Sequence, residues 1–260
     1  MKSRSPVILL CAGGLTWLLG QAVLPDMGLQ TSERYDAVAD ARDLEALSAG
    51  LLVIAGCLLV LGALALTQTL VDVRGPGARL VRAGTPMLAL GGVWLVAGRA
   101  AFNMVFLRVT TDDVPRTVAI SMLDAGGGAE FIPLLLTLPC LLLGPVLLAL
   151  GLRRAGLAGW LPLVAWVVGI GAFLATEFTI KAGEIAGIGL AAVALTLIGW
   201  AASRPAAAFD LDSNSGVASE RSPVGGPRQL ADGGGPGSSQ VRLNQSANRC
   251  GFRRSTQHLV

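Results

Sequence analysis

Six apolar runs divide residues 1–204 of the chain, and polar loops separate them. The runs lie near residues 6–24, 47–71, 86–107, 131–152, 160–178 and 183–202. A hydrocarbon core of about 30 Å is crossed by about 20 helical residues, and each run is close to that length. Backbone groups in lipid must be hydrogen-bonded within their own segment, so each run is expected to be a helix. The pattern predicts an all-α fold, a polytopic transmembrane helix bundle with six spans.

The loops between the runs carry opposite charges on alternate sides of the predicted membrane. Basic residues predominate before the first run and in the loops after the second and fourth runs: Lys2, Arg4, Arg74, Arg79, Arg82, Arg153 and Arg154. The loops 25–46 and 108–130 instead carry an excess of Asp and Glu. Short loops rich in Lys and Arg face the cytoplasm. We therefore expect both termini in the cytoplasm and the acidic loops outside.

The first run also has features of a secretory signal. Lys2 and Arg4 precede it, and Gly20-Gln21-Ala22 loosely resembles a cleavage site. The run is long for a signal peptide and five further spans follow, which favours a retained anchor. Composition agrees with a membrane protein, because only 14% of the residues are charged, against about 25% in typical soluble proteins.

Residues 205–260 differ in composition from the rest of the chain. Gly, Pro and Ser are frequent, and no periodic apolar pattern remains. Such a segment cannot bury enough apolar surface to offset the entropy of ordering, so a disordered cytoplasmic tail is expected beyond a transmembrane domain at 1–204. Its Arg249, Arg253 and Arg254 could contact anionic lipid, or the tail could be solvated without a partner.

The two outer loops are expected to differ from each other. In the first, Ser32 can cap a short helix with Glu33 and Asp36 in its first turn, which leads towards the second span. Asp36, Asp40 and Asp43 then share one face, read as a solvated acidic face in preference to a calcium site. The second outer loop looks more flexible, and its residues 118–123 could dip into the membrane interface.

Small residues at four-residue spacing predict close helix packing between the fifth and sixth spans. Gly183, Gly187 and Ala191 share one register of the sixth span, and Ala165 and Gly169 do so in the fifth. In lipid, helices associate through such close fit because lipid tails are as apolar as leucine.

Ionisable residues inside the spans carry the candidate chemistry. Arg99 lies well inside the third span, and Asn103 follows four residues later on the same helical face. Glu177 is the preferred partner of Arg99, Glu130 opens the fourth span, and Lys181 and Glu184 lie in the adjoining turn. With Gln21 these residues could form a polar cluster in the outer third of the bundle.

Three interpretations of this cluster stay open. It could be a structural ion pair that fixes helix register, a site that handles a solute or ion, or a set of side chains that reach towards the surface without a partner.

Several function classes lack their motifs in this chain. There is no HExxH, GxSxG or Walker A sequence, and His258 is the only histidine. The cysteines are Cys11, Cys57, Cys140 and Cys250, which form no CxxC pair. No basic patch with interleaved aromatics is present. We therefore expect no metal, no cofactor, no nucleic-acid partner and no catalysis.

The stretch from Leu143 to Arg154 reads LGPVLLALGLRR, and Trp160-Leu161-Pro162 follows it. It resembles small bacterial six-span membrane proteins of unknown function, in which one span ends in ALGLxR and the next begins near WLP. The resemblance implies a six-span fold in a bacterial plasma membrane, and it implies no activity and no site.

The expected function is a non-catalytic accessory or sensing role in the membrane, with the lipid bilayer and another membrane protein or a second copy as partners. The alternative is a small-solute or ion transporter that uses the polar cluster. An intramembrane enzyme is the third class considered, and it would require a deeper, water-accessible polar cavity.

Overall fold

The computed structural model describes residues 4–26, 30–71, 75, 77–111, 113–125, 138–176 and 179–204. Within these ranges every regular element is helical, which confirms the all-α prediction. The helices are α1 (Ser5–Val23), α2 (Thr31–Asp40), α3 (Arg42–Leu70), α4 (Ala78–Trp94), the π-helical η1 (Leu95–Ala100), α5 (Ala101–Val109), α6 (Arg116–Ala125), α8 (Leu138–Arg154), α9 (Leu161–Thr176) and α10 (Lys181–Ser203).

Four of these helical segments are long and apolar enough to cross a membrane. They are α1, α3, the continuous segment Ala78–Val109 formed by α4, η1 and α5, and α10. The shorter apolar helix α9 and the 17-residue helix α8 occupy the fifth and fourth predicted runs. The third predicted run began at Pro86, but the helix begins at Ala78 and contains that proline. The segments 131–137 and 177–178 of the predicted runs, and the predicted tail 205–260, lie outside the described residues.

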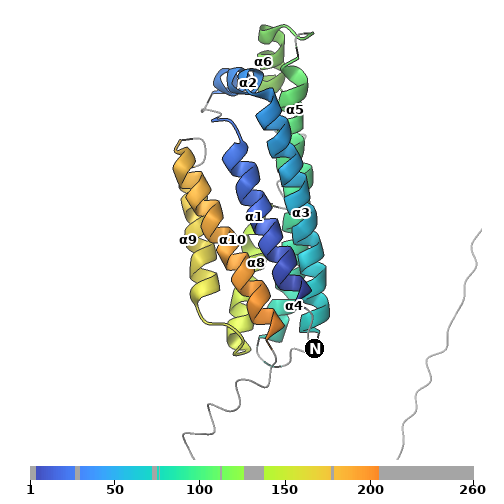
Figure 1. Ribbon diagram of the computed structural model, residues 1–260, viewed down its shortest axis with the longest axis vertical. Coiled ribbons are helices and arrows are strands. Elements are labelled where there is room, and N and C mark those ends of the chain that lie inside the picture. The colour runs from blue at the N-terminus through green and yellow to red at the C-terminus, as the bar shows by residue number, and fades with distance from the viewer. Residues whose placement is uncertain are drawn as a thin grey trace, which may run out of the picture. The chain divides into compact units, whose positions relative to one another are not determined.

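The long helices pack side by side (Figure 1). Helix α1 packs between α3 and α10, α10 also contacts α9, and α4 contacts both α3 and α8. Helices α2 and α6 lie together at one end, which we call the capped end. The start of α1, the α8–α9 connection and the end of α10 lie at the opposite end, which we call the basic end.

Glycines allow the helices to approach closely at several contacts. A Cβ added to Gly169 of α9 would lie 2.6 Å from the carbonyl oxygen of Gly187 in α10, and one added to Gly187 would meet Gly169 in the same way. The predicted packing of these two helices is therefore confirmed. Gly56 of α3 and Gly92 of α4 approach each other similarly.

The charges of the described residues separate between the two ends of the bundle. At the basic end the described charged residues are all arginines: Arg4, Arg79, Arg82, Arg153, Arg154 and Arg204. The described acids gather in α2, in α6, in the adjoining turns and in the helix turns nearest the capped end. Between the ends, the helices expose large apolar side chains such as Leu64, which is 54% exposed, and Val168, which is 52% exposed. A helix that is apolar on both its buried and its exposed faces is typical of a membrane span.

The capped end differs from its sequence prediction in three respects. Helix α2 begins at Thr31 and not after a Ser32 cap, and the Glu33 carboxylate accepts a hydrogen bond from the Gln30 backbone N–H at 3.1 Å. The second outer loop contains the helix α6, where a flexible segment was expected. Helix α2 ends at Asp40 and the chain bends at Ala41, so the predicted acidic face does not continue as one helix to Asp43.

Candidate functional site

A buried hydrogen bond connects α1 and α10 near the capped end. Gln21 Nε2 donates to Glu184 Oε2 at 2.8 Å, and both residues are almost completely buried. Lys181 Nζ lies 3.8 Å from the same oxygen, one helical turn earlier. Glu184 stands in the first turn of α10, where the helix dipole favours a negative charge. These three side chains therefore fix the first turn of α10 against the end of α1.

Helix α3 contributes a second buried acid to the same region. Glu45 lies in the first turn of α3 and is 0% exposed. Neither of its carboxylate oxygens has a hydrogen-bond partner within the described part of the chain, and the charges of Arg99 and Lys181 act on it. One turn further along α3, the Ser48 hydroxyl donates to the Gly20 carbonyl oxygen at 2.8 Å. The buried face of α3 is thus polar where it meets the end of α1.

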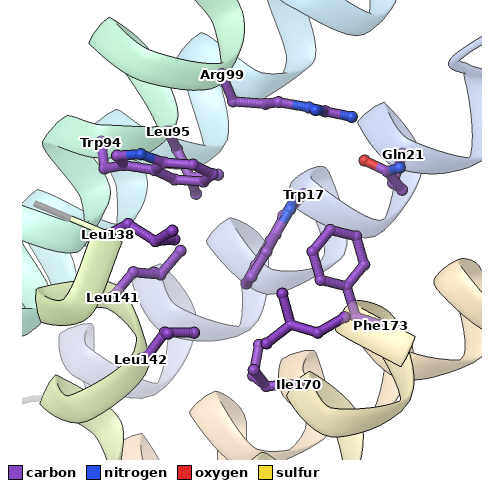
Figure 2. A pocket seen from close by; sticks show the side chains of 11 residues that line it. Trp17, Gln21, Trp94, Leu95, Arg99, Leu138, Leu141, Leu142, Ile170 and Phe173 are labelled. Carbon is purple, nitrogen blue, oxygen red and sulfur yellow. The ribbon is translucent and has the colours of Figure 1, made fainter. Parts of the chain in front are cut away.

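Arg99 lies in the π-helical turn η1 of the long helix Ala78–Val109. Figure 2 shows its side chain crossing the bundle towards Gln21 of α1. Lys181 is close enough to Arg99 for the positive charges of the two side chains to interact. Single π-helical turns are rare and occur frequently at functional sites. We refer to Gln21, Glu45, Arg99, Lys181 and Glu184 as the polar cluster.

Asn103 is completely buried in α5, and neither of its amide atoms has a hydrogen-bond partner among the residues described. Arg42 shows the register of the facing helices, because its guanidinium donates to the carbonyl oxygens of Thr110 at 3.1 Å and Leu107 at 3.3 Å. Glu45, one turn further along α3, is therefore level with Asn103 to within about one helical turn.

Of the residues in the predicted cluster, the structure describes Gln21, Arg99, Asn103, Lys181 and Glu184. The charges of Arg99 and Lys181 interact with each other, and Asn103 is buried one helical turn beyond Arg99. Glu130 and Glu177 lie outside the described residues, so the pairing of Arg99 with Glu177 stays a prediction. Sequence reasoning missed Glu45, which it assigned to the outer loop.

Beyond the polar cluster, α2 and α6 are joined by an ion pair. Arg116 Nε donates to Asp36 Oδ1 at 2.8 Å and Nη2 donates to Oδ2 at 2.7 Å, while the guanidinium lies 5.9 Å from the centre of the Tyr35 ring. The hydrogen bond from Arg116 lowers the pKa of Asp36, and Asp36 raises the pKa of Arg116. Beneath the pair, Leu24 of the α1 end, Val38 of α2 and Phe106 of α5 form a small buried core of their own.

A small cavity of about 20 Å³ lies between α1, η1, α8 and α9. Trp17, Trp94 and several leucines line it, and Arg99 and Gln21 stand at its polar side (Figure 2). That volume is sufficient for about one water molecule. In the described ranges, no three His, Cys, Asp or Glu side chains come together in a group that could hold a metal ion.

Comparison of the chain with protein-family models, with curated proteins and with solved structures gives no match.

Proposed function

We propose that the chain is a six-span integral membrane protein of a bacterial plasma membrane, with both termini in the cytoplasm. The four membrane-length helices and their exposed apolar side chains support insertion into a bilayer. Helix α9 has 16 described residues, about 24 Å of helix, and the apolar sequence of the fourth and fifth runs continues beyond the described parts of α8 and α9. This continuation supports two further spans.

The charge separation supports the orientation. Arginines alone carry the described charges of the basic end, and short basic loops face the cytoplasm. The capped end, with α2 and α6, would then face outward.

Within this arrangement we propose a non-catalytic accessory or sensing role. The observation that carries this proposal is that Glu45, the buried acid of the polar cluster in α3, lies in the first turn of that helix, directly after α2. Arg42 begins the helix that carries Glu45, and it also binds the carbonyl oxygens at the end of α5. A ligand or partner that displaces α2 or α6 would therefore act on the ends of α3 and α5, and through them on Glu45 and Asn103.

A transporter of a small solute or ion is the second candidate. Arg99 favours it, because an ionisable residue in a π-helical turn inside a span is a feature of sites that handle polar ligands. The cavity beside Arg99 is small and mostly lined by apolar side chains, which favours the first proposal.

Reporter fusions test the topology. A reporter that is active only in the cytoplasm should be active when fused near Ala78 and after Val260, and inactive when fused near Asp113. A reporter active only outside the cytoplasm should give the reverse pattern. The orientation is wrong if the fusion near Ala78 behaves like the fusion near Asp113.

Hydrogen exchange tests the coupling between the capped end and the polar cluster. Asp36→Asn weakens the α2/α6 ion pair, and the exposed Asp40→Asn in the same helix is a control with the same change of charge. Asp36→Asn should increase amide exchange in the first two turns of α3 and α10 and leave their turns at the basic end unchanged. Equal exchange in the two variants would remove the support for a sensing role.

A further inference from the structure

The basic end of the bundle contains a second, open pocket that the proposed function does not use. Its volume is about 400 Å³, and it lies between the α8–α9 connection and the end of α10. Arg153 and Arg204 border it from the two helices, and Gly156 and Gly159 lie along the connection. A Cβ added to either glycine would meet nothing within 4 Å, so the pocket is open along the backbone of the connection.

The connection that forms one wall of the pocket has a fixed geometry. Gly156 adopts a positive φ of 71°, the Gly156 N–H donates to the Arg153 carbonyl oxygen at 3.0 Å, and the Leu157 N–H donates to the Leu152 carbonyl oxygen at 2.8 Å. This pair of bonds is the Schellman ending of a helix, and the buried Leu157 side chain completes it. The pocket wall is therefore held by backbone hydrogen bonds.

Both arginines of the pocket stack on tryptophans. The Arg153 guanidinium carbon lies 3.5 Å from the centre of the Trp160 ring, and that of Arg204 lies 3.4 Å from the centre of the Trp200 ring. Stacking uses the flat face of a guanidinium, while its N–H donors point outward from the edge. Such a fork is suited to the oxygens of a phosphate group.

The surroundings of the pocket favour a lipid as the source of that phosphate. Trp160 and Trp200 are about half exposed and stand at helix ends, the position where tryptophan concentrates at membrane–water interfaces. From the pocket, an exposed apolar stripe follows α9 through Leu161, Val164 and Val168, and acyl chains could lie along it.

We propose that the Arg153–Arg204 pocket binds the phosphate headgroup of an anionic phospholipid. The inference depends on membrane insertion, one part of the proposed function, and not on the orientation or on a sensing role. Two arginines face the headgroup, and no acid among the described residues of this end opposes it. Basic pockets between helix ends recognise anionic lipid headgroups by this chemistry.

Lipid titration of the full chain in detergent, followed by native mass spectrometry, tests the proposal. The probes are phosphatidylglycerol, phosphatidylcholine with the same acyl chains, and glycerol 1-phosphate as a headgroup without chains. The test variant is Arg153→Gln/Arg204→Gln. The control variant is Arg79→Gln/Arg82→Gln, which removes the same charge from exposed positions of the same end outside the pocket.

The wild-type chain should bind phosphatidylglycerol more tightly than phosphatidylcholine. The test variant should lose roughly 10- to 30-fold in affinity for phosphatidylglycerol, and the control should lose much less. Equal binding of the two lipids, or an equal loss in the control, would overturn the proposal. Glycerol 1-phosphate binding as tightly as the lipid would show a site for soluble phosphates instead.

If the test variant does not fold, Arg153→Lys/Arg204→Lys is titrated with phosphatidylglycerol in its place. It keeps both charges but removes the planar fork, so it should bind phosphatidylglycerol more weakly than the wild type, and unchanged binding would contradict the assigned geometry. Because the assay is done in detergent, a negative result leaves the reporter-fusion result for the topology unaffected.

Discussion

Gly169 and Gly171 stand two residues apart in α9 and provide a matched test of the packing between α9 and α10. A Cβ at position 169 would lie 2.6 Å from the Gly187 carbonyl oxygen and 2.8 Å from the Ala191 nitrogen. Contacts below 3.0 Å are not tolerated by real Cβ atoms, and both neighbours are backbone, so the helices must separate. A Cβ at position 171 would meet nothing within 4 Å.

The expected magnitudes follow from two opposing effects. Overpacking a tight contact costs about 1–3 kcal/mol, while replacing a helical glycine by alanine contributes about 0.5–1 kcal/mol of stability. The overpacking prevails at position 169, because only movement of the whole helix relieves the contact. We expect Gly169→Ala to lower the free energy of unfolding by about 1–2 kcal/mol, and Gly171→Ala to leave it unchanged or raise it by up to about 1 kcal/mol.

Unfolding in mixed micelles with increasing sodium dodecyl sulfate, followed by tryptophan fluorescence, measures both variants against the wild type. The order of the two variants decides the result, since the substitution and the helix are the same. If Gly169→Ala is as stable as Gly171→Ala, the result contradicts the close packing of α9 against α10 at Gly169.

Three further predictions concern the capped end and the polar cluster. The ion pair lowers the pKa of Asp36 below its ordinary value of 3.8, so the stability that the pair contributes is present above that pH and is lost as the pH falls below it. The melting temperatures of the wild type and of Asp36→Asn should therefore converge in acid. A difference in melting temperature that does not change with pH would argue against the pair. Gln21→Leu and Glu184→Leu, which each remove one partner, should show a coupling of about 0.5–2 kcal/mol in a double-mutant cycle of unfolding free energies, whereas independent losses would mean that the 2.8 Å hydrogen bond contributes nothing. Arg99→Ala and Glu177→Ala should each lower the thermal stability in detergent, and the double variant should lose less than their sum; additive losses would separate the two residues.

The apolar runs predicted the long helices well because these helices carry apolar side chains on their exposed as well as their buried faces. The predicted first run differs from α1 by one residue at each end, and the sixth run lies within α10. The predicted third run begins at Pro86, eight residues after the helix itself begins at Ala78. The turns before it contain arginines but still pack against α8, with Gly84 close to the backbone of Leu148.

The polar cluster was only partly predictable, because hydropathy assigns a charged residue at a helix end to the loop. Glu45 precedes the second apolar run, yet it shares the buried face of α3 with Ser48, Leu52 and Gly56 at helical spacing. That spacing was the available signal. The ion pair between α2 and α6 joins residues 36 and 116, and no local pattern predicts a contact over that separation.

The π-helical turn at Leu95–Ala100 interrupts the helical segment Ala78–Val109. Such a turn holds about one residue more than an α-helical turn, so removing one residue there would restore regular α-helical spacing and keep Asn103 and Phe106 on their buried face. The same deletion in the regular turns of α4 would rotate every later residue by about 100°. The loss of one residue at the π-helical turn would therefore shorten this helix without reorienting the capped end.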